Sequence, residues 1–277
     1  MVLQDCKNTF TFGQPITNLN FNNMSGLFNV KGKTAFISGS SGGLGLVFAR
    51  GLAQNGAKVI LNGRNGQKLN EAQKQLQKEG FEIDAYSFDV TDSKAIEQAV
   101  NKVVEAHGTP DILINNAGVQ RRHNLEEFPE GEFDEVLNGN LKSAFLLSKA
   151  FVPGMIKRKS GKVINICSLQ SELGRATITP YAASKGGLKM MTRGMATEWA
   201  KYNIQVNGIG PGYYKTEMTK ALYENKEFNA WLCGRTPADR WGNPEELLGA
   251  LLFLSSDASS YVNGQIIYVD GGITACI

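Results

Sequence analysis

The chain has 277 residues, a length that a single doubly wound α/β domain can accommodate. Apolar residues make up 42% of the chain and charged residues 20%, and the longest apolar runs fall far short of the roughly 18 residues that cross a membrane. The sequence therefore excludes a disordered chain and membrane spans. The 29 basic and 26 acidic side chains give a net charge of +3 with no basic stripe, which argues against a nucleic-acid partner.

The cysteines and histidines are too scattered to form a recognisable metal site. Cys6, Cys167, Cys233 and Cys276 contain no C-x-x-C pair, and the chain has only two histidines. We therefore expect no metal, and a reducing, cytoplasmic compartment.

The first 28 residues are rich in Asn and Thr and lack the charged start, apolar segment and small-residue cleavage site of a secretory signal. We expect residues 1–28 to be a poorly ordered extension. The alternative is an arm that packs on a neighbouring subunit.

From Lys33 onward, short apolar runs alternate with longer segments of helical period, which predicts repeated βαβ units in one domain over residues 29–277. Seven parallel strands are expected, at residues 34–38, 58–62, 83–88, 112–115, 162–167, 205–209 and 265–269. The predicted fold class is α/β, doubly wound, with helices on both faces of the sheet. Around 213–240 the rhythm breaks into a longer insertion, which we interpret as a mobile substrate lid.

A glycine-rich turn follows the first expected strand and leads into a helix. Glycine allows a tight turn, lets the backbone approach a pyrophosphate, and aims helix N–H groups at its charge. The candidate cofactor-binding residues here are Gly39, Ser41, Gly43, Leu44 and Gly45. A P-loop is excluded because the terminal Gly-Lys-Ser/Thr is missing. The alternative is a turn needed only for strand-to-helix packing.

The choice of dinucleotide depends on the residues that end the second strand. A carboxylate there would bind a ribose 2′-hydroxyl, but this chain has Gly63 followed by Arg64, whose guanidinium can pair with a 2′-phosphate. NADP is therefore favoured over NAD, unless Arg64 is only a solvated surface residue. Further cofactor-binding candidates at the carboxyl ends of the third and fourth strands are Asp89, Val90, Asn116, Ala117 and Gly118.

Tyr181 and Lys185 are four residues apart in a segment of helical period, so their side chains should share one face. An ammonium, together with the positive nicotinamide of an oxidised cofactor, should lower the tyrosine pKa. Tyr181 would then exchange a proton with a substrate hydroxyl while hydride moves, and Ser168 would hold the reacting oxygen. In isolation, such a pair is ordinary helix surface.

Together, several motifs resemble the short-chain dehydrogenase/reductase family over residues 29–277. They are Gly39-x-x-x-Gly43-x-Gly45, Asn115-Asn116-Ala117-Gly118, Ser168, Tyr181-x-x-x-Lys185 and Pro211-Gly212. The resemblance implies a Rossmann fold, a homotetramer, and catalytic roles for Asn140, Ser168, Tyr181 and Lys185, with Asn140 holding a water in a proton relay beyond the lysine. It further implies that Lys185 holds the nicotinamide ribose and that Thr216, together with Pro211 and Gly212, lies at the cofactor.

Within that family, the stretches at 118–123, 164–175 and 235–242 look like bacterial gluconate 5-dehydrogenases. This likeness implies interconversion of D-gluconate and 5-keto-D-gluconate. The extension over 1–28 and the glycine at 63 depart from the pattern, and the glycine strengthens the NADP interpretation.

A sugar acid needs a cation for its carboxylate and polar groups for its hydroxyls. The candidate substrate residues are Arg121, Arg122, Gln170, Glu172 and Arg175. The alternative for each of them is a solvated loop residue or a subunit-interface ion pair.

Two other functions stay open at this point. One is reduction of another keto sugar acid, such as a deoxyhexulosonate, or of an acyl-carrier thioester. The other is a dinucleotide-binding sensor without turnover, against which the complete Asn, Ser, Tyr and Lys set argues.

Overall fold

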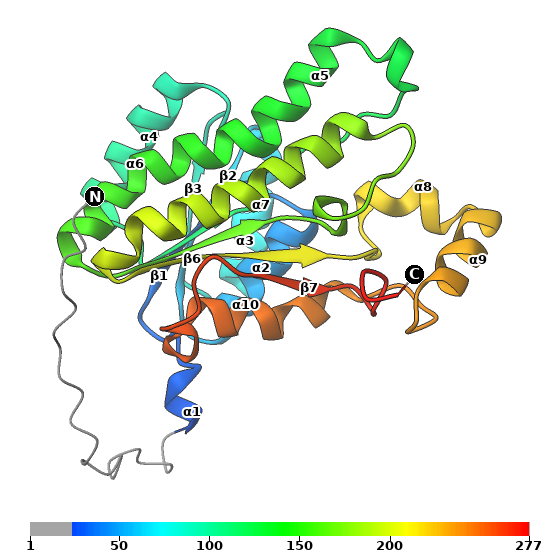
Figure 1. The fold of residues 1–277 in the computed structure, drawn as a ribbon. Coiled ribbons are helices and arrows are strands. Elements are labelled where there is room, and N and C mark those ends of the chain that lie inside the picture. The colour runs from blue at the N-terminus through cyan, green and yellow to red at the C-terminus, as the bar shows by residue number, and fades with distance from the viewer. Residues whose placement is uncertain (1–23, 277) are drawn as a thin grey trace, which may run out of the picture.

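The computed structural model describes residues 24–276, so most of the expected extension over 1–28, and Cys6, lie outside it. Seven parallel strands form one sheet in the order β3-β2-β1-β4-β5-β6-β7 (Figure 1). The strands are β1 (Thr34–Ile37), β2 (Lys58–Gly63), β3 (Ile83–Ser87), β4 (Ile112–Asn115), β5 (Gly161–Ile166), β6 (Ile204–Pro211) and β7 (Ile266–Val269). The predicted doubly wound fold and its parallel sheet are confirmed.

The central strands are apolar on both faces because helices cover both sides of the sheet. Phe36 on β1 lies opposite Ile60 on β2 and Leu113 on β4, and the three side chains join one core. The next residue, Ile37, points to the other face and joins a second core. A short, uninterrupted apolar run is therefore enough to specify a buried parallel strand here.

The helices divide between the two faces of the sheet (Figure 1). One face carries α2 (Gly43–Gln54), α3 (Gly66–Lys78) and α10 (Leu248–Ser255), and the other carries α4 (Ser93–His107), α6 (Ser143–Arg158) and α7 (Thr179–Trp199). The strand order reverses between β1 and β4, where connections leave toward opposite faces and open a crevice at the carboxyl ends. No helix within 24–276 is both long and apolar enough to span a bilayer.

One helix changes its pitch midway. It runs from α5 (Glu130–Leu137) through a π-helical turn at Asn138–Lys142 into α6, with helical backbone angles at both junctions. Such turns contain one extra residue and occur frequently at functional sites. This one holds Asn140, a predicted catalytic residue.

The 213–240 segment contains a 3₁₀ turn at Glu217–Thr219 and two helices, α8 (Lys220–Tyr223) and α9 (Lys226–Arg235). They extend beyond the end of the sheet (Figure 1). A β-bridge joins Tyr214 to Gly242, so both ends of the segment meet at one place. The remaining short elements are α1 (Met24–Leu27) and 3₁₀ turns at Leu125–Glu127, Leu169–Ser171, Ala200–Tyr202, Pro244–Leu247 and Asp257–Ser259.

Candidate active site

A cleft of about 570 Å³ lies at the carboxyl edge of the sheet, and most of the predicted site residues line it. Those that do are Gly39, Ser41, Gly43, Leu44, Arg64, Asp89, Val90, Asn116, Ala117, Gly118, Arg122, Ser168, Gln170, Arg175, Tyr181, Lys185, Pro211, Gly212 and Thr216. Four others, Gly45, Arg121, Asn140 and Glu172, lie outside its lining. The fold thus brings the expected nucleotide, acid–base and substrate groups into one space.

The glycine turn is compact enough that side chains would collide in it. Gly39 has a φ of +63°, and a Cβ on it would lie 2.8 Å from the Cα of Ala117. A Cβ on Gly45 would lie 2.4 Å from the carbonyl oxygen of Gly39. Gly45 therefore serves close packing between turn and helix, while Gly43, with no atom within 4 Å of its Cβ position, faces open space.

Two asparagines and a serine brace this turn, a role that the sequence analysis missed. The Asn116 amide donates to the carbonyls of Ser38 (3.0 Å) and Gly39 (2.9 Å). The Gly39 N–H donates to Asn62 Oδ1 at 3.3 Å, and the backbone N–H groups of Asn116 and Ala117 donate to Ser38 Oγ. In the sequence, this role is indicated by a polar residue at or next to the end of each of these buried strands.

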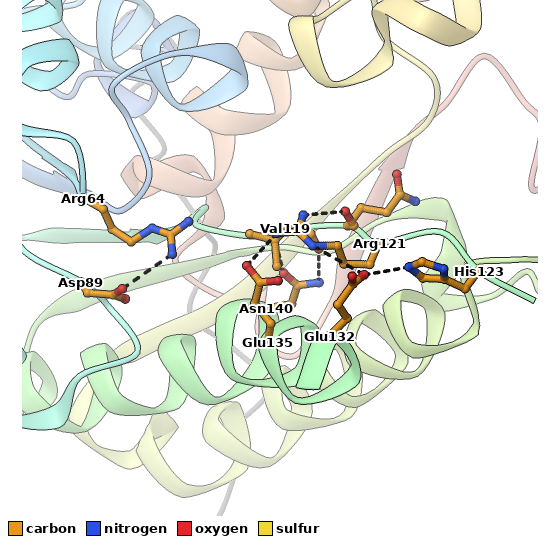
Figure 2. Close-up of polar contacts among 9 residues, drawn as sticks. Arg64, Asp89, Val119, Arg121, His123, Glu132, Glu135 and Asn140 are labelled. Carbon is orange, nitrogen blue, oxygen red and sulfur yellow. Dashed lines mark hydrogen bonds and ion pairs between the residues drawn. The ribbon is translucent and has the colours of Figure 1, made fainter. Parts of the chain in front are cut away.

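Arg64 stands at the far end of the cleft with a side chain that is 60% exposed (Figure 2). Its guanidinium lies 3.7 Å from an Asp89 carboxylate oxygen. Burial raises the pKa of Asp89, but hydrogen bonds from Thr91 and the charge of Arg64 outweigh burial and leave that pKa below its ordinary value. A second cation, Lys68, places Nζ 3.3 Å from where a Cβ on Gly42 would be. Lys68 is not among the cofactor-binding residues expected from the sequence.

The turn and its flanking cations fit a dinucleotide that carries a 2′-phosphate. A Cβ at Gly63 would stand 3.1 Å from Ser41 Oγ, so a side chain there would require the Ser41 hydroxyl to move slightly. Arg64, with a side chain that is 60% exposed and 3.7 Å from Asp89, presents a guanidinium that can pair with a phosphate.

Tyr181 and Lys185 occupy the first turns of α7, and Ser168 begins the 3₁₀ turn after β5. The ammonium of Lys185 lies 5.7 Å from the centre of the Tyr181 ring and donates to the carbonyl of Ile166 at 2.6 Å. Burial lowers the pKa of Lys185 to about 8. The Ser168 hydroxyl donates to Gln170 Oε1 at 2.6 Å and accepts from the Gln170 N–H at 3.2 Å.

The pKa of Tyr181 in the free protein is raised, whereas the sequence led us to expect a lowered pKa when the oxidised cofactor is bound. In the protein alone, desolvation raises the pKa of Tyr181, and its hydrogen bond with Ser168 acts in the opposite sense. The Lys185 ammonium lies 5.7 Å from the ring centre and donates a hydrogen bond to the Ile166 carbonyl, and the pKa of Tyr181 still lies above its ordinary value in the free protein. The phenol of the free protein is therefore protonated at neutral pH.

Asn140 braces the cleft wall from the π turn (Figure 2). Its Oδ1 accepts from the Val119 N–H at 2.7 Å, and its amide donates to the Val119 carbonyl and to Ser184 Oγ, both at 3.0 Å. A Cβ on Gly118 would lie 2.9 Å from Asn140 Oδ1 and 3.8 Å from Lys185 Nζ. Asn140 thus adjoins the lysine, but both amide protons are committed to protein groups.

Arg122 and Arg175 enter the cleft from different loops. Among residues 24–276, no carboxylate is ion-paired with either guanidinium. Burial lowers the pKa of Arg122, and the charge of Arg175 lowers it further. Two cations that have no carboxylate partner within the described part of the chain can bind an anion beside Tyr181.

Arg121 and Glu172 are placed elsewhere. Arg121 donates to Glu135 at 2.8 Å and lies 3.8 Å from Glu132, which also binds His123 at 2.9 Å (Figure 2). Glu172 pairs with Lys189 and accepts from Tyr268 at 2.7 Å. Arg121 is therefore held by carboxylates 11 and 14 positions away, while the adjacent Arg122 lines the cleft.

The family model for short chain dehydrogenases matches residues 33–227. The chain therefore belongs to the short-chain dehydrogenase family of oxidoreductases. It is 53% identical over 254 residues to the 5-keto-D-gluconate 5-reductase of Escherichia coli strain K12, covering 92% of this chain and 100% of that one. The resemblance expected from the sequence is confirmed.

Two further relatives bear on the site. The 2-dehydro-3-deoxy-D-gluconate 5-dehydrogenase of Formosa agariphila is 51% identical over 253 residues, with 91% of this chain and 96% of that one covered. A crystal structure of a gluconate 5-dehydrogenase from Burkholderia cenocepacia J2315 in complex with NADP and tartrate superposes with a TM-score of 0.89. It is 46% identical and covers 91% of this chain and 99% of that one.

Proposed function

We propose that the protein is an NADP-dependent oxidoreductase that interconverts D-gluconate and 5-keto-D-gluconate. The observation that carries this proposal is a pair of arginines, Arg122 and Arg175, in the same cleft as Tyr181 and Lys185, with neither arginine ion-paired with a carboxylate of residues 24–276. Two cations at this place suit a carboxylate substrate and oppose an acyl chain or a neutral alcohol. The 53% identity to a 5-keto-D-gluconate 5-reductase supports the same substrate.

The cofactor side follows from the glycine turn. Backbone N–H groups at the start of α2 face the pyrophosphate position, Arg64 and Ser41 meet a 2′-phosphate, and Lys185 holds the nicotinamide ribose. Thr216, Pro211 and Gly212 contact the nicotinamide end. When bound, NADP supplies the acceptor or donor of hydride. The remaining cofactor contacts are assigned to Gly39, Gly43, Leu44, Asp89, Val90, Asn116, Ala117 and Gly118, which line the same cleft, and to Gly45, which packs behind it.

The acid–base chemistry belongs to the chain's own side chains. In the reductive direction, the Tyr181 hydroxyl donates its proton to the carbonyl oxygen, which Ser168 also holds by a hydrogen bond. Ser168 must first release Gln170, its acceptor at 2.6 Å. Lys185 stabilises the resulting phenolate, and Asn140 holds this wall of the cleft in place and adjoins the relay that returns the proton.

On the substrate side, Arg122 and Arg175 take the carboxylate and Gln170 takes a hydroxyl. Arg121 and Glu172, expected from the sequence to contact the substrate, are assigned supporting roles because each is paired with protein groups. The 213–240 segment, whose Thr216, Met218, Thr219 and Leu222 line the cleft, is assigned the role of a lid.

A second substrate is favoured by one observation. The chain is almost as similar to a 2-dehydro-3-deoxy-D-gluconate 5-dehydrogenase, at 51% identity, as to the reductase of 5-keto-D-gluconate. Both substrates are six-carbon sugar acids, so the two arginines serve either one. 5-Keto-D-gluconate is reduced at carbon 5 and 2-dehydro-3-deoxy-D-gluconate is oxidised there, and apart from carbon 5 they differ at carbons 2 and 3.

The test is a spectrophotometric assay of the purified protein in both directions. With NADPH or NADH the substrates are 5-keto-D-gluconate, L-sorbose and an acetoacetyl thioester, and with NADP+ or NAD+ they are D-gluconate and 2-dehydro-3-deoxy-D-gluconate. The largest reductive kcat/KM is expected for 5-keto-D-gluconate with NADPH, and the larger oxidative value is expected for D-gluconate. A larger oxidative value for the deoxy acid would exchange the two candidates, and nucleotide binding without any turnover would indicate a sensor.

We also propose that the chain forms a homotetramer in the cytoplasm. Large apolar side chains lie exposed on α6 and α7, with Phe145 46% and Met190 58% exposed, and such side chains support a subunit interface. Light scattering that returns the 30.1 kDa of one chain would contradict the assembly. Recovery of the native protein outside the cytoplasmic fraction would contradict the location.

A further inference from the structure

Arg175 is held in the cleft against the repulsion of another cation. Arg122 lies close enough for the charge of Arg175 to lower its pKa, and neither has a carboxylate partner among the described residues. Two like charges that share a partly dry space move apart unless other contacts hold them. The contacts that hold Arg175 therefore decide whether both arginines are aimed at one substrate group.

Both contacts of Arg175 come from the 213–240 segment. Its guanidinium donates to the Tyr213 hydroxyl at 2.8 Å. Its central carbon lies 4.6 Å from the centre of the Phe228 ring and 5.9 Å from that of Tyr213. A guanidinium over an aromatic face at this distance makes a cation–π contact, which strengthens as water is excluded.

The Phe228 ring is itself fixed by other aromatic side chains. Its centre lies 5.9 Å from that of Tyr213, 5.3 Å from that of Trp231 and 6.4 Å from that of Trp241. The Trp241 indole N–H donates to Asn229 Oδ1 at 2.6 Å, which ties the cluster to α9. The ring is therefore a rigid support, although Phe228 itself does not line the cleft.

The loop that carries Arg122 is also held in place. The His123 N–H, one residue after Arg122, donates to the Thr177 carbonyl at 3.1 Å. This bond joins the loop of Arg122 to the loop of Arg175. Thr177 has a φ of +70°, a conformation that a β-branched residue rarely adopts. The distance between the two arginine loops is thus set by backbone, while the direction of Arg175 is set by Phe228 and Tyr213.

We propose that Phe228 is a positioning residue that orients Arg175 toward the substrate carboxylate. The position of α9 and the recognition of the substrate's charge are then coupled. This inference rests on the proposed function. It assigns to α9 a part in substrate discrimination in addition to covering the cleft.

The experiment compares Phe228→Leu with the parent on two substrates. L-Sorbose matches 5-keto-D-gluconate except that a hydroxymethyl group replaces the carboxylate. Phe228→Leu should lower kcat/KM for 5-keto-D-gluconate about fivefold to tenfold, through KM, which is the size of a partly desolvated cation–π contact. It should change kcat/KM for L-sorbose by less than about twofold, because L-sorbose has no carboxylate for Arg175 to bind.

Two variants serve as controls. Phe228→Tyr keeps the aromatic face and should restore the parent KM. Ala230→Leu changes an exposed position on the same helix and should leave both substrates within about twofold of the parent. A fluorescence titration with NADPH shows that each variant is folded, since its nucleotide affinity should match the parent's.

The outcomes separate the two proposals. A parent enzyme that does not prefer 5-keto-D-gluconate over L-sorbose overturns the proposed function and this inference with it. A parent that has the preference, together with a Phe228→Leu variant that keeps it, overturns only the role of Phe228. Equal losses on both substrates mean that Phe228 packs α9 without aiming Arg175, which also overturns the inference.

Discussion

The two ends of the cleft are built in different ways. The nucleotide end is made of strand ends and a glycine turn. Asparagine side chains brace it by accepting hydrogen bonds from backbone N–H groups or donating them to backbone carbonyls. The substrate end is made of loops and of α9, held by contacts between side chains such as Arg175 and Phe228. The first end is fixed by the sheet, and the second can change its specificity without disturbing the fold.

The largest expected effect comes where the two ends meet. Tyr181→Phe removes the transferable proton and keeps the ring, so kcat should fall by about 100-fold or more while NADPH affinity is unchanged. Steady-state turnover and a fluorescence titration measure the two quantities separately. A kcat within about threefold of the parent would remove Tyr181 from the acid–base role.

The next effect lies at the nucleotide end. Gly63→Asp with Arg64→Ile should invert the preference from NADPH to NADH, changing the ratio of the two kcat/KM values by roughly 100-fold, because a phosphate contact is lost and a carboxylate is added. Gly63→Ala is the matched control, since a Cβ there already stands 3.1 Å from Ser41 Oγ. If the double variant keeps the parent ratio, Ser41 or Lys68 reads the phosphate instead.

At the substrate end, two neighbouring arginines should behave differently. Arg122→Ala should lower kcat/KM for 5-keto-D-gluconate by about tenfold to 100-fold and leave L-sorbose little changed, because one charge-assisted contact is lost. Arg121→Ala, which loses its ion pair with Glu135, should affect both substrates equally and weakly. If Arg121→Ala is the selective variant, the carboxylate is bound on the other side of that loop.

A buried lysine at the amino edge of the sheet lies outside both ends of the cleft. Burial lowers the pKa of Lys162 to about 8, and its ammonium donates to Ser259. The unfolded chain binds the proton more tightly, so this lysine destabilises the fold fully below pH 8 and progressively less as the pH rises from 8 toward 10.5. Lys162→Met should therefore raise Tm at pH 7, and its advantage over the parent should shrink by pH 10. Thermal unfolding at several pH values checks this, and a constant difference between the two proteins would contradict it.

The smallest effect concerns the strained backbone between the two arginine loops. Thr177 has a φ of +70°, which asparagine adopts more easily than a β-branched residue. Thr177→Asn should raise Tm by roughly 2 to 4 °C without changing KM, because the carbonyl that accepts from His123 is kept. A lower Tm would show that the threonine side chain stabilises this loop.

The positions of the residues at the proposed nucleotide end could be predicted from the sequence far better than those at the proposed substrate end. Strands such as 112–115 and the turn from Gly39 to Gly45 are specified by local patterns, and the fold places them without further information. Arg121 and Arg122 are chemically alike and adjacent, so only long-range partners such as Glu135 decide which one enters the cleft. The contact between Phe228 and Arg175 spans 53 positions and has no local signal.

The π turn at Asn138–Lys142 sets the rotational phase between α5 and α6. Deleting one residue there would restore an ordinary helix but rotate α5 by about 100° relative to α6. Glu132 and Glu135 would then leave Arg121 and His123, while Leu147 and Phe151 on α6 kept their places in the core. A single extra residue therefore lets α5 direct its carboxylates toward Arg121 and His123 while α6 directs its apolar side chains into the core.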